Sequence, residues 1–121
     1  MSGHTEWFIP DCYFPAGGTE EPYTSHESVC VLNTGGEDAA LSFTLYFEDR
    51  EPMEGFHAVC GARRTHHVRM DRQTSDRGEA IPRGVPYAIR MVSSVPVHVQ
   101  YSRCDTTQAN MAFMTAIPPH S

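Results

Sequence analysis

Short segments in which apolar and polar residues alternate run through most of this chain, and turn-forming residues separate them. The clearest alternation is in residues 41–48, where Leu41, Phe43, Leu45 and Phe47 are interleaved with serine, threonine, tyrosine and glutamate. Successive side chains of a β-strand point to opposite faces of its sheet. The pattern therefore predicts a strand with these four side chains on its core face.

A second clear alternation is in residues 95–103, where Val97 and Val99 are predicted to face the core. Further strands are expected over residues 28–33, 56–60, 65–70 and 87–92. Several short strands separated by turns are typical of an antiparallel sandwich or barrel. We therefore expect an all-β fold.

The segments between the expected strands contain residues typical of turns and loops. Residues 34–38 read Thr-Gly-Gly-Glu-Asp, which predicts a turn that joins strands 28–33 and 41–48 into a hairpin. Residues 10–25 and 71–86 are rich in proline, glycine and charged residues, so loops are expected there. Residues 105–117 suit a turn followed by a closing strand, although Asp105 and Gln108 also fit the cap of a short helix.

The length of 121 residues indicates a single domain spanning residues 1–121. No apolar run approaches the ~20 residues that cross a bilayer, and the first residues do not resemble a secretory signal. A cytoplasmic location is therefore expected. The cysteines are scattered, which favours reduced thiols that pack as small apolar side chains: Cys12, Cys30, Cys60 and Cys104.

The charge of the chain narrows the choice of partners. The formal net charge is −6, and all nine basic residues are arginine. The absence of lysine excludes a P-loop lysine and a Schiff-base lysine. Because an acidic protein repels nucleic acid unless it has a concentrated basic face, no nucleic-acid partner is expected.

The motifs of common enzymes and metal sites are missing from the sequence. Ser25, His26 and Glu27 include the residue types of a catalytic triad, but neighbours in a strand point apart, so no triad is expected. The seven histidines show no diagnostic ligand spacing. We therefore expect neither catalysis nor a metal or other cofactor.

The densest polar cluster is residues 63–69. As a strand, it would place Arg63, Thr65, His67 and Arg69 on one face, where guanidinium groups could bind a carboxylate, a phosphate or an acidic partner. A solvated outer face is the alternative. His66 would lie at the edge of the core, where a lone histidine is more often a hydrogen-bonded structural residue than a ligand.

Aromatic residues near the N-terminus leave two interpretations open. Trp7 lies close to Phe8, Tyr13 and Phe14, as a sugar-binding groove would require. The alternative, that Trp7 closes one end of a sandwich, is favoured for a lone tryptophan in a chain this small. Polar residues that could meet a hydroxylated ligand are Glu27, Gln100, Arg103 and Asp105.

Taken in order along the chain, several blocks of residues resemble the sensory rhodopsin transducer family. The resemblance extends from about Trp7 to Ile117. The blocks that carry it are Trp7, Ser25-His26-Glu27, residues 29–33, Asp49-Arg50-Glu51-Pro52, residues 62–69, Val95-Pro96-Val97, and Gln100, Arg103, Asp105, Gln108 and Ala109.

The resemblance implies a β-sandwich of jelly-roll type, a homotetramer, and a role as a cytoplasmic adaptor that binds a microbial sensory rhodopsin. The family also resembles carbohydrate-binding modules, which makes a sugar-like small molecule the alternative partner. The positions it implies for ligand or partner binding are Glu27, Asn33, Arg63, Arg64, His66, Arg69, Gln100, Arg103 and Asp105.

Overall fold

The computed structural model describes residues 3–16, 25–105 and 112–121. The described residues form antiparallel strands and one short 3₁₀ turn, η1 (Met70–Arg72). The strands are β1 (His4–Cys12), β2 (His26–Asn33), β3 (Ala39–Phe47), β4 (Met53–Cys60), β5 (Arg64–Arg69), β6 (Tyr87–Asp105) and β7 (Ala112–Ala116). The expected all-β antiparallel sandwich is confirmed, whereas its jelly-roll type stays a prediction. None of the helices in the described part of the chain has the length and apolar character needed to cross a membrane.

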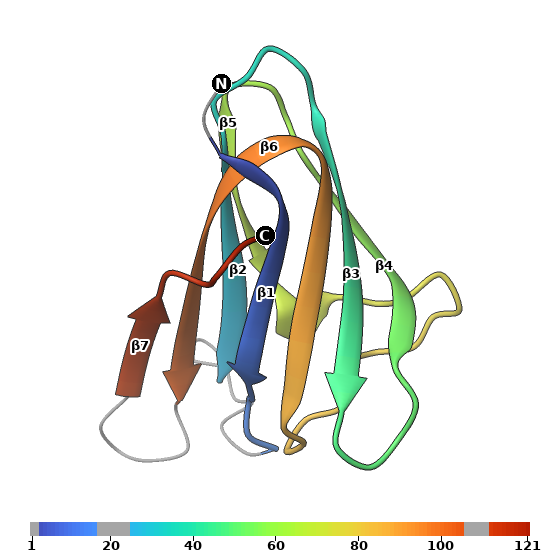
Figure 1. Cartoon of the computed structure of the whole chain (residues 1–121). Helices are drawn as coiled ribbons and strands as arrows, with labels where there is room; N and C mark the ends of the chain where they lie inside the picture. Colours follow the sequence, from blue (N-terminus) through green and yellow to red (C-terminus); the bar gives the residue numbers. More distant parts are fainter. Residues whose placement is uncertain (1–2, 17–24, 106–111) are drawn as a thin grey trace.

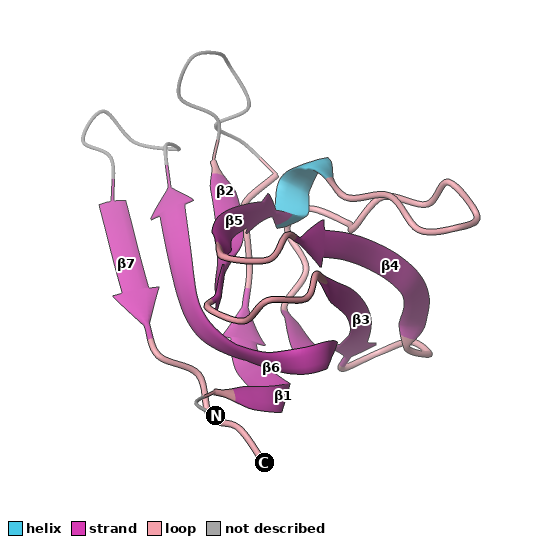
Figure 2. Ribbon diagram, turned by 90° about the horizontal axis from the view of Figure 1, so that it is seen from above, coloured by secondary structure: helices cyan, strands magenta, loops and turns pink. Residues whose placement is uncertain are grey.

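Strand β6 belongs to both layers of the sandwich. Its first half lies between β1 and β3, and its second half lies between β2 and β7. Figures 1 and 2 show the strand arching from one layer to the other. Ser93 stabilises the bend by donating its hydroxyl to the Val95 carbonyl at 2.6 Å. The two strands expected at residues 87–92 and 95–103 are therefore one bent strand.

The hairpin expected between residues 28–33 and 41–48 is wrong. Strand β2 pairs with β5 and β6, whereas β3 pairs with β4 and β6. The turn between them carries the chain from one layer to the other. Asn33 organises this crossing by donating its amide to the Glu37 and Cys60 carbonyls at 2.7 and 3.1 Å and accepting the Gly35 N–H at 3.0 Å.

The core lies between the two layers, as the alternation predicted. Leu41, Phe43 and Leu45 are buried from β3, and Val97 and Val99 are buried from β6. Phe47 is only partly buried and packs at the margin of the core. Residues 41–48 therefore supply an apolar face to one layer, and the second half of β6 supplies one to the other.

Strand β1 was not expected, because only two of its apolar side chains, Trp7 and Ile9, alternate clearly before the proline-rich segment. Trp7 is 4% exposed and donates its indole N–H to the His4 carbonyl at 3.2 Å. This burial supports the interpretation in which Trp7 closes part of the sandwich.

The C-terminal part of the chain returns to β1. The closing strand expected within residues 105–117 is present as β7, while residues 106–111 and the expected cap partner Gln108 lie outside the described residues. After β7, the chain reaches β1, where Phe8 N–H donates to the Pro119 carbonyl at 3.0 Å (Figure 1). The His120 ring stacks on the His4 ring with centroids 3.5 Å apart.

Candidate functional site

A buried carboxylate joins both layers at the end of the sandwich where β1 stops and β6 starts. Glu27 is fully buried on β2 and accepts the Tyr13 N–H at 2.6 Å. The hydroxyls of Tyr87 and Tyr101 also donate to this carboxylate, one to each oxygen. Because the two tyrosines lie on the two halves of β6, Glu27 ties the halves of the bent strand together.

Arg103 continues this network to the surface. It is the register partner of Glu27, and its Nε lies 3.5 Å from the Glu27 carboxylate. Its other end donates to the Asp11 carbonyl at 3.2 Å and lies 3.5 Å from the Asp11 carboxylate, whose side chain is 89% exposed. A chain of charges therefore leads from the core to solvent.

Burial changes the acid–base properties of Glu27 and its neighbours. Burial raises the pKa of Glu27 above its ordinary value of 4.5, and this rise is partly offset by the hydrogen bonds from Tyr87 and Tyr13 and by the charge of Arg103. Burial, with the nearby Glu27 charge, also raises the pKa values of Tyr87 and of the Cys12 thiol. Neither the phenol nor the thiol is an activated nucleophile.

A second network holds the loops next to this end. Arg69 donates two hydrogen bonds of 2.8 Å to Asp71, whose side chain is only 4% exposed. Arg83 lies 3.7 Å from the same carboxylate and donates to the Pro15 and Ser25 carbonyls at 3.2 and 3.1 Å. Arg69, which the sequence placed on an open face, is therefore engaged inside its own chain.

The arginine cluster is arranged differently from the strand that the sequence predicted. Strand β5 begins at Arg64, and Arg63 lies in the preceding turn with a φ of 55°. Arg63 therefore does not share a strand face with Thr65 and His67, which corrects the expected arrangement. Both arginine side chains are exposed, and His66 bonds through Nδ1 to the Val59 carbonyl at 2.9 Å.

The expected site residues fall into separate places. Glu27 and Arg103 meet at one end of the sandwich, whereas Asn33, Arg63, Arg64 and His66 lie at the other, where β2 pairs with β5. Gln100 is exposed and donates to the Thr115 hydroxyl at 2.6 Å. Asp105 pairs through its backbone with Ala112, and its side chain lies outside the description.

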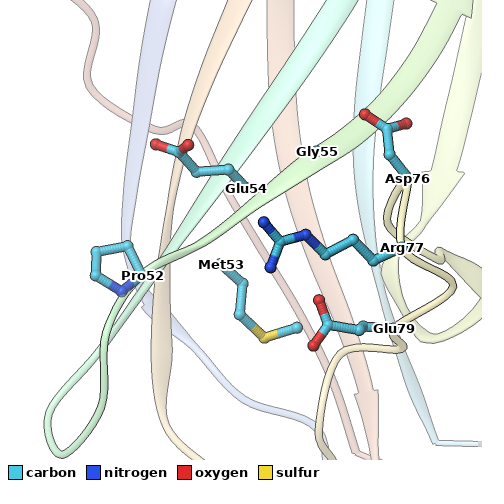
Figure 3. Close-up of a pocket in the computed structure, with 7 residues that line it drawn as sticks. All are labelled: Pro52, Met53, Glu54, Gly55, Asp76, Arg77 and Glu79. Atoms are coloured by element: carbon cyan, nitrogen blue, oxygen red, sulfur yellow. The ribbon is translucent and has the colours of Figure 1, made fainter.

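Several cavities open on the surface. One of about 430 Å³ lies between the start of β4 and the turn at residues 75–79 (Figure 3). Another, of about 420 Å³, is lined by residues 33–37 with Val95 and Pro96. Within the described residues, no three histidine, cysteine, aspartate or glutamate side chains come together as a metal site would require.

A third cavity, of about 290 Å³, lies at the Glu27 end, and sequence reasoning missed it. We call it the aromatic cavity; its lining is Pro10, Asp11, Tyr46, Phe47, Glu48, Pro86, Tyr87 and Ala88. These residues come from the ends of β1 and β3 and the start of β6, which lie side by side in Figure 1. Their separation along the chain leaves no local motif that could have revealed the cavity.

Fold and sequence together define the class of the protein. A family model described as Anabaena sensory rhodopsin transducer matches residues 2–118, and the chain belongs to this family. No match was found among curated proteins.

Two solved structures resemble this chain closely. The crystal structure of Thermotoga maritima 1070 matches with a TM-score of 0.88 and 36% identity, over 100% of this chain and 97% of that one. The Anabaena sensory rhodopsin transducer matches with a TM-score of 0.73 and 39% identity, over 83% of this chain and 87% of that one.

Proposed function

We propose that this chain is a non-catalytic signalling adaptor that binds the cytoplasmic face of a microbial sensory rhodopsin. The observation that carries the proposal is the 39% identity to the Anabaena sensory rhodopsin transducer over most of both chains. The site chemistry agrees with binding, because the buried polar groups are engaged with one another and the thiol and phenol beside Glu27 are held neutral.

The proposal is tested with a purified receptor. The sensory rhodopsin of Anabaena is reconstituted in lipid nanodiscs, mixed with the chain and separated by size-exclusion chromatography. The chain is expected to migrate with rhodopsin-loaded nanodiscs and not with empty ones. Equal migration with empty nanodiscs, or migration alone in both cases, would contradict a receptor-specific adaptor.

We further propose that the adaptor works in the cytoplasm as a homotetramer. The outer face of the layer formed by β1, β3, β4 and β6 supports association, since the exposed side chains of Ala40 and Val59 lie on it beside serine and threonine. Small sandwiches often cover such faces with another copy. Light scattering is expected to give four chains per particle, and a monomer at every concentration would contradict this arrangement.

A second candidate function is the binding of a sugar-like small molecule. The aromatic cavity favours it, because the exposed Tyr46 and the carboxylate residues Asp11 and Glu48 line it together. Rings cover the apolar face of a sugar, and carboxylates accept its hydroxyls. A thermal-shift screen over sugars tests this function, since a ligand that binds only the folded chain raises its melting temperature.

A further inference from the structure

The aromatic cavity has the composition of a site for a basic side chain. Tyr46, which is 42% exposed, supplies the accessible ring; Phe47 and Tyr87 also line the cavity, but Phe47 is partly buried against the core and Tyr87 is buried. Asp11 and Glu48 add two carboxylates at the same opening. Aromatic faces and carboxylates together attract an ammonium or guanidinium group through cation–π and charge–charge interactions.

The chain itself shows that one ring of this lining accepts a cation. The guanidinium carbon of Arg50 lies 5.4 Å from the centre of the Phe47 ring. Arg50 is paired with Asp49 at 3.0 Å, so its charge is compensated outside the cavity. The ring of Tyr46 has no such partner among the described residues and stays open to a cation from another molecule.

Both carboxylates have capacity for a further cation. Asp11 is held on one side by Arg103 at 3.5 Å, but 89% of its side chain is exposed. Glu48 is exposed and makes no ion pair with a described residue. The cavity therefore keeps negative charge that the described residues do not fully neutralise.

We propose that the aromatic cavity receives a lysine or arginine side chain from a cytoplasmic loop of the membrane receptor. This inference rests on the proposed adaptor function and names the chemistry of its contact. Cytoplasmic loops of membrane proteins carry an excess of lysine and arginine. A chain with a net charge of −6 complements such loops, and the cavity offers one point where a basic side chain meets the exposed Tyr46 ring and two carboxylates.

The arginine pair at the opposite end does not fit the same partner. Arg63 and Arg64 are exposed cations, which basic receptor loops would repel. An acidic segment of a receptor would bind there instead and would leave the aromatic cavity empty. The two surfaces therefore predict opposite effects of charge substitutions.

The test compares two double variants with the same change in charge. Asp11→Asn with Glu48→Gln removes two carboxylates from the aromatic cavity. Glu54→Gln with Glu79→Gln removes two from the cavity in Figure 3, where both residues line the wall. The dissociation constant for sensory rhodopsin in nanodiscs is measured for the parent chain and both variants, after circular dichroism has established that each is folded.

The first variant is expected to bind about tenfold more weakly, and the second within about twofold of the parent, because only close charge pairs contribute strongly. Tyr46→Ala is expected to weaken binding as well, whereas Leu32→Ala, an exposed apolar control on the other layer, is not. Parent-like binding by the cavity variant would overturn the inference and leave the adaptor function intact. An equal loss in both double variants would overturn it too, because the effect would then come from net charge.

A second arm separates this inference from the proposed function. A short peptide of lysine and arginine residues is titrated into the parent chain, with a glutamine peptide as control, and amide shifts are followed by NMR. Saturable shifts at Tyr46, Phe47 and Glu48 would support the cavity proposal whether or not the rhodopsin binds. Failure of the rhodopsin to bind would refute only the adaptor function. Absence of shifts there would overturn the cavity proposal.

Discussion

Tyr87 and Tyr101 lie on opposite layers of the sandwich but on one strand, and their hydroxyls donate to the same Glu27 carboxylate. The bend of β6 between them lets one strand take part in both layers. A polar contact therefore helps to close this end of the core. Because the carboxylate is buried, its protonation affects the stability of the whole domain.

Substituting Glu27 by Gln is expected to change the pH dependence of stability. The folded-state pKa of Glu27 lies above its ordinary value of 4.5 because of burial. The folded chain then retains a proton that the unfolded chain loses, so this contribution is fully present below pH 4.5 and is lost as the pH rises through the folded-state pKa.

Urea unfolding at a series of pH values measures this effect. The parent chain should lose free energy of unfolding across that window, and the Glu27→Gln variant should lose less. The exposed control Glu54→Gln should keep the slope of the parent. Identical slopes in parent and Glu27→Gln would show that Glu27 does not titrate in this window.

Substituting Arg69 by Ala is expected to destabilise the chain. The change would leave the almost fully buried Asp71 without its two hydrogen bonds from Arg69, although Arg83 stays near. An unsatisfied buried polar group costs about 1–3 kcal/mol. The exposed Arg63→Ala is the matched control and should change the free energy of unfolding by less than about 0.5 kcal/mol.

Chemical denaturation of the two arginine variants tests whether Arg69 stabilises the fold or is a free surface cation. A loss of stability confined to Arg69→Ala is the expected result. If the free energy of unfolding of Arg69→Ala equalled that of the parent, Arg69 would not stabilise the fold and would count as a free surface cation.

The four thiols are expected to divide into two classes. Cys12 and Cys60 are buried, and burial raises the pKa of both thiols. Cys30 and Cys104 are partly exposed. Because the thiolate is the reactive form, Ellman's reagent should modify Cys30 and Cys104 in the folded chain and the other two only after unfolding. Rapid modification of Cys12 in the native state would contradict the closed core at the Glu27 end.

Trp7 is expected to report on the C-terminal segment. The His120 ring lies 5.2 Å from the Trp7 ring and is stacked on His4. Substituting His120 by Ala should change the emission of this single tryptophan and reduce stability by less than about 1 kcal/mol, because the contact is at the surface. His67→Ala, an exposed histidine on β5, is the control. An unchanged spectrum in His120→Ala would show that this segment does not rest on β1 in solution.

The sequence predicted the strands whose two faces differ most. Leu41, Phe43 and Leu45 alternate with polar neighbours, and this contrast identifies a strand without knowledge of its partners. Trp7 and Ile9 gave too short a pattern for β1. The turn residues after Asn33 suit a hairpin and a crossing between layers equally well, so only the pairing of β2 with β5 and β6 could distinguish them.

The candidate site was predictable only in part. Glu27 and Arg103 were named from the sequence, and their contact depends on the register between β2 and the second half of β6. Asp11, Tyr46 and Tyr87 meet only because three strand ends lie side by side. No local pattern encodes such a meeting, since it is produced by the strand order of the whole layer.

The most direct test of the adaptor function is the affinity of the parent chain for a sensory rhodopsin in nanodiscs, measured at low and at high salt. An adaptor that contacts basic receptor loops should bind saturably, and its dissociation constant should rise as salt screens the charges. Absence of saturable binding at low salt would contradict the account, and binding that is independent of salt would contradict its electrostatic basis.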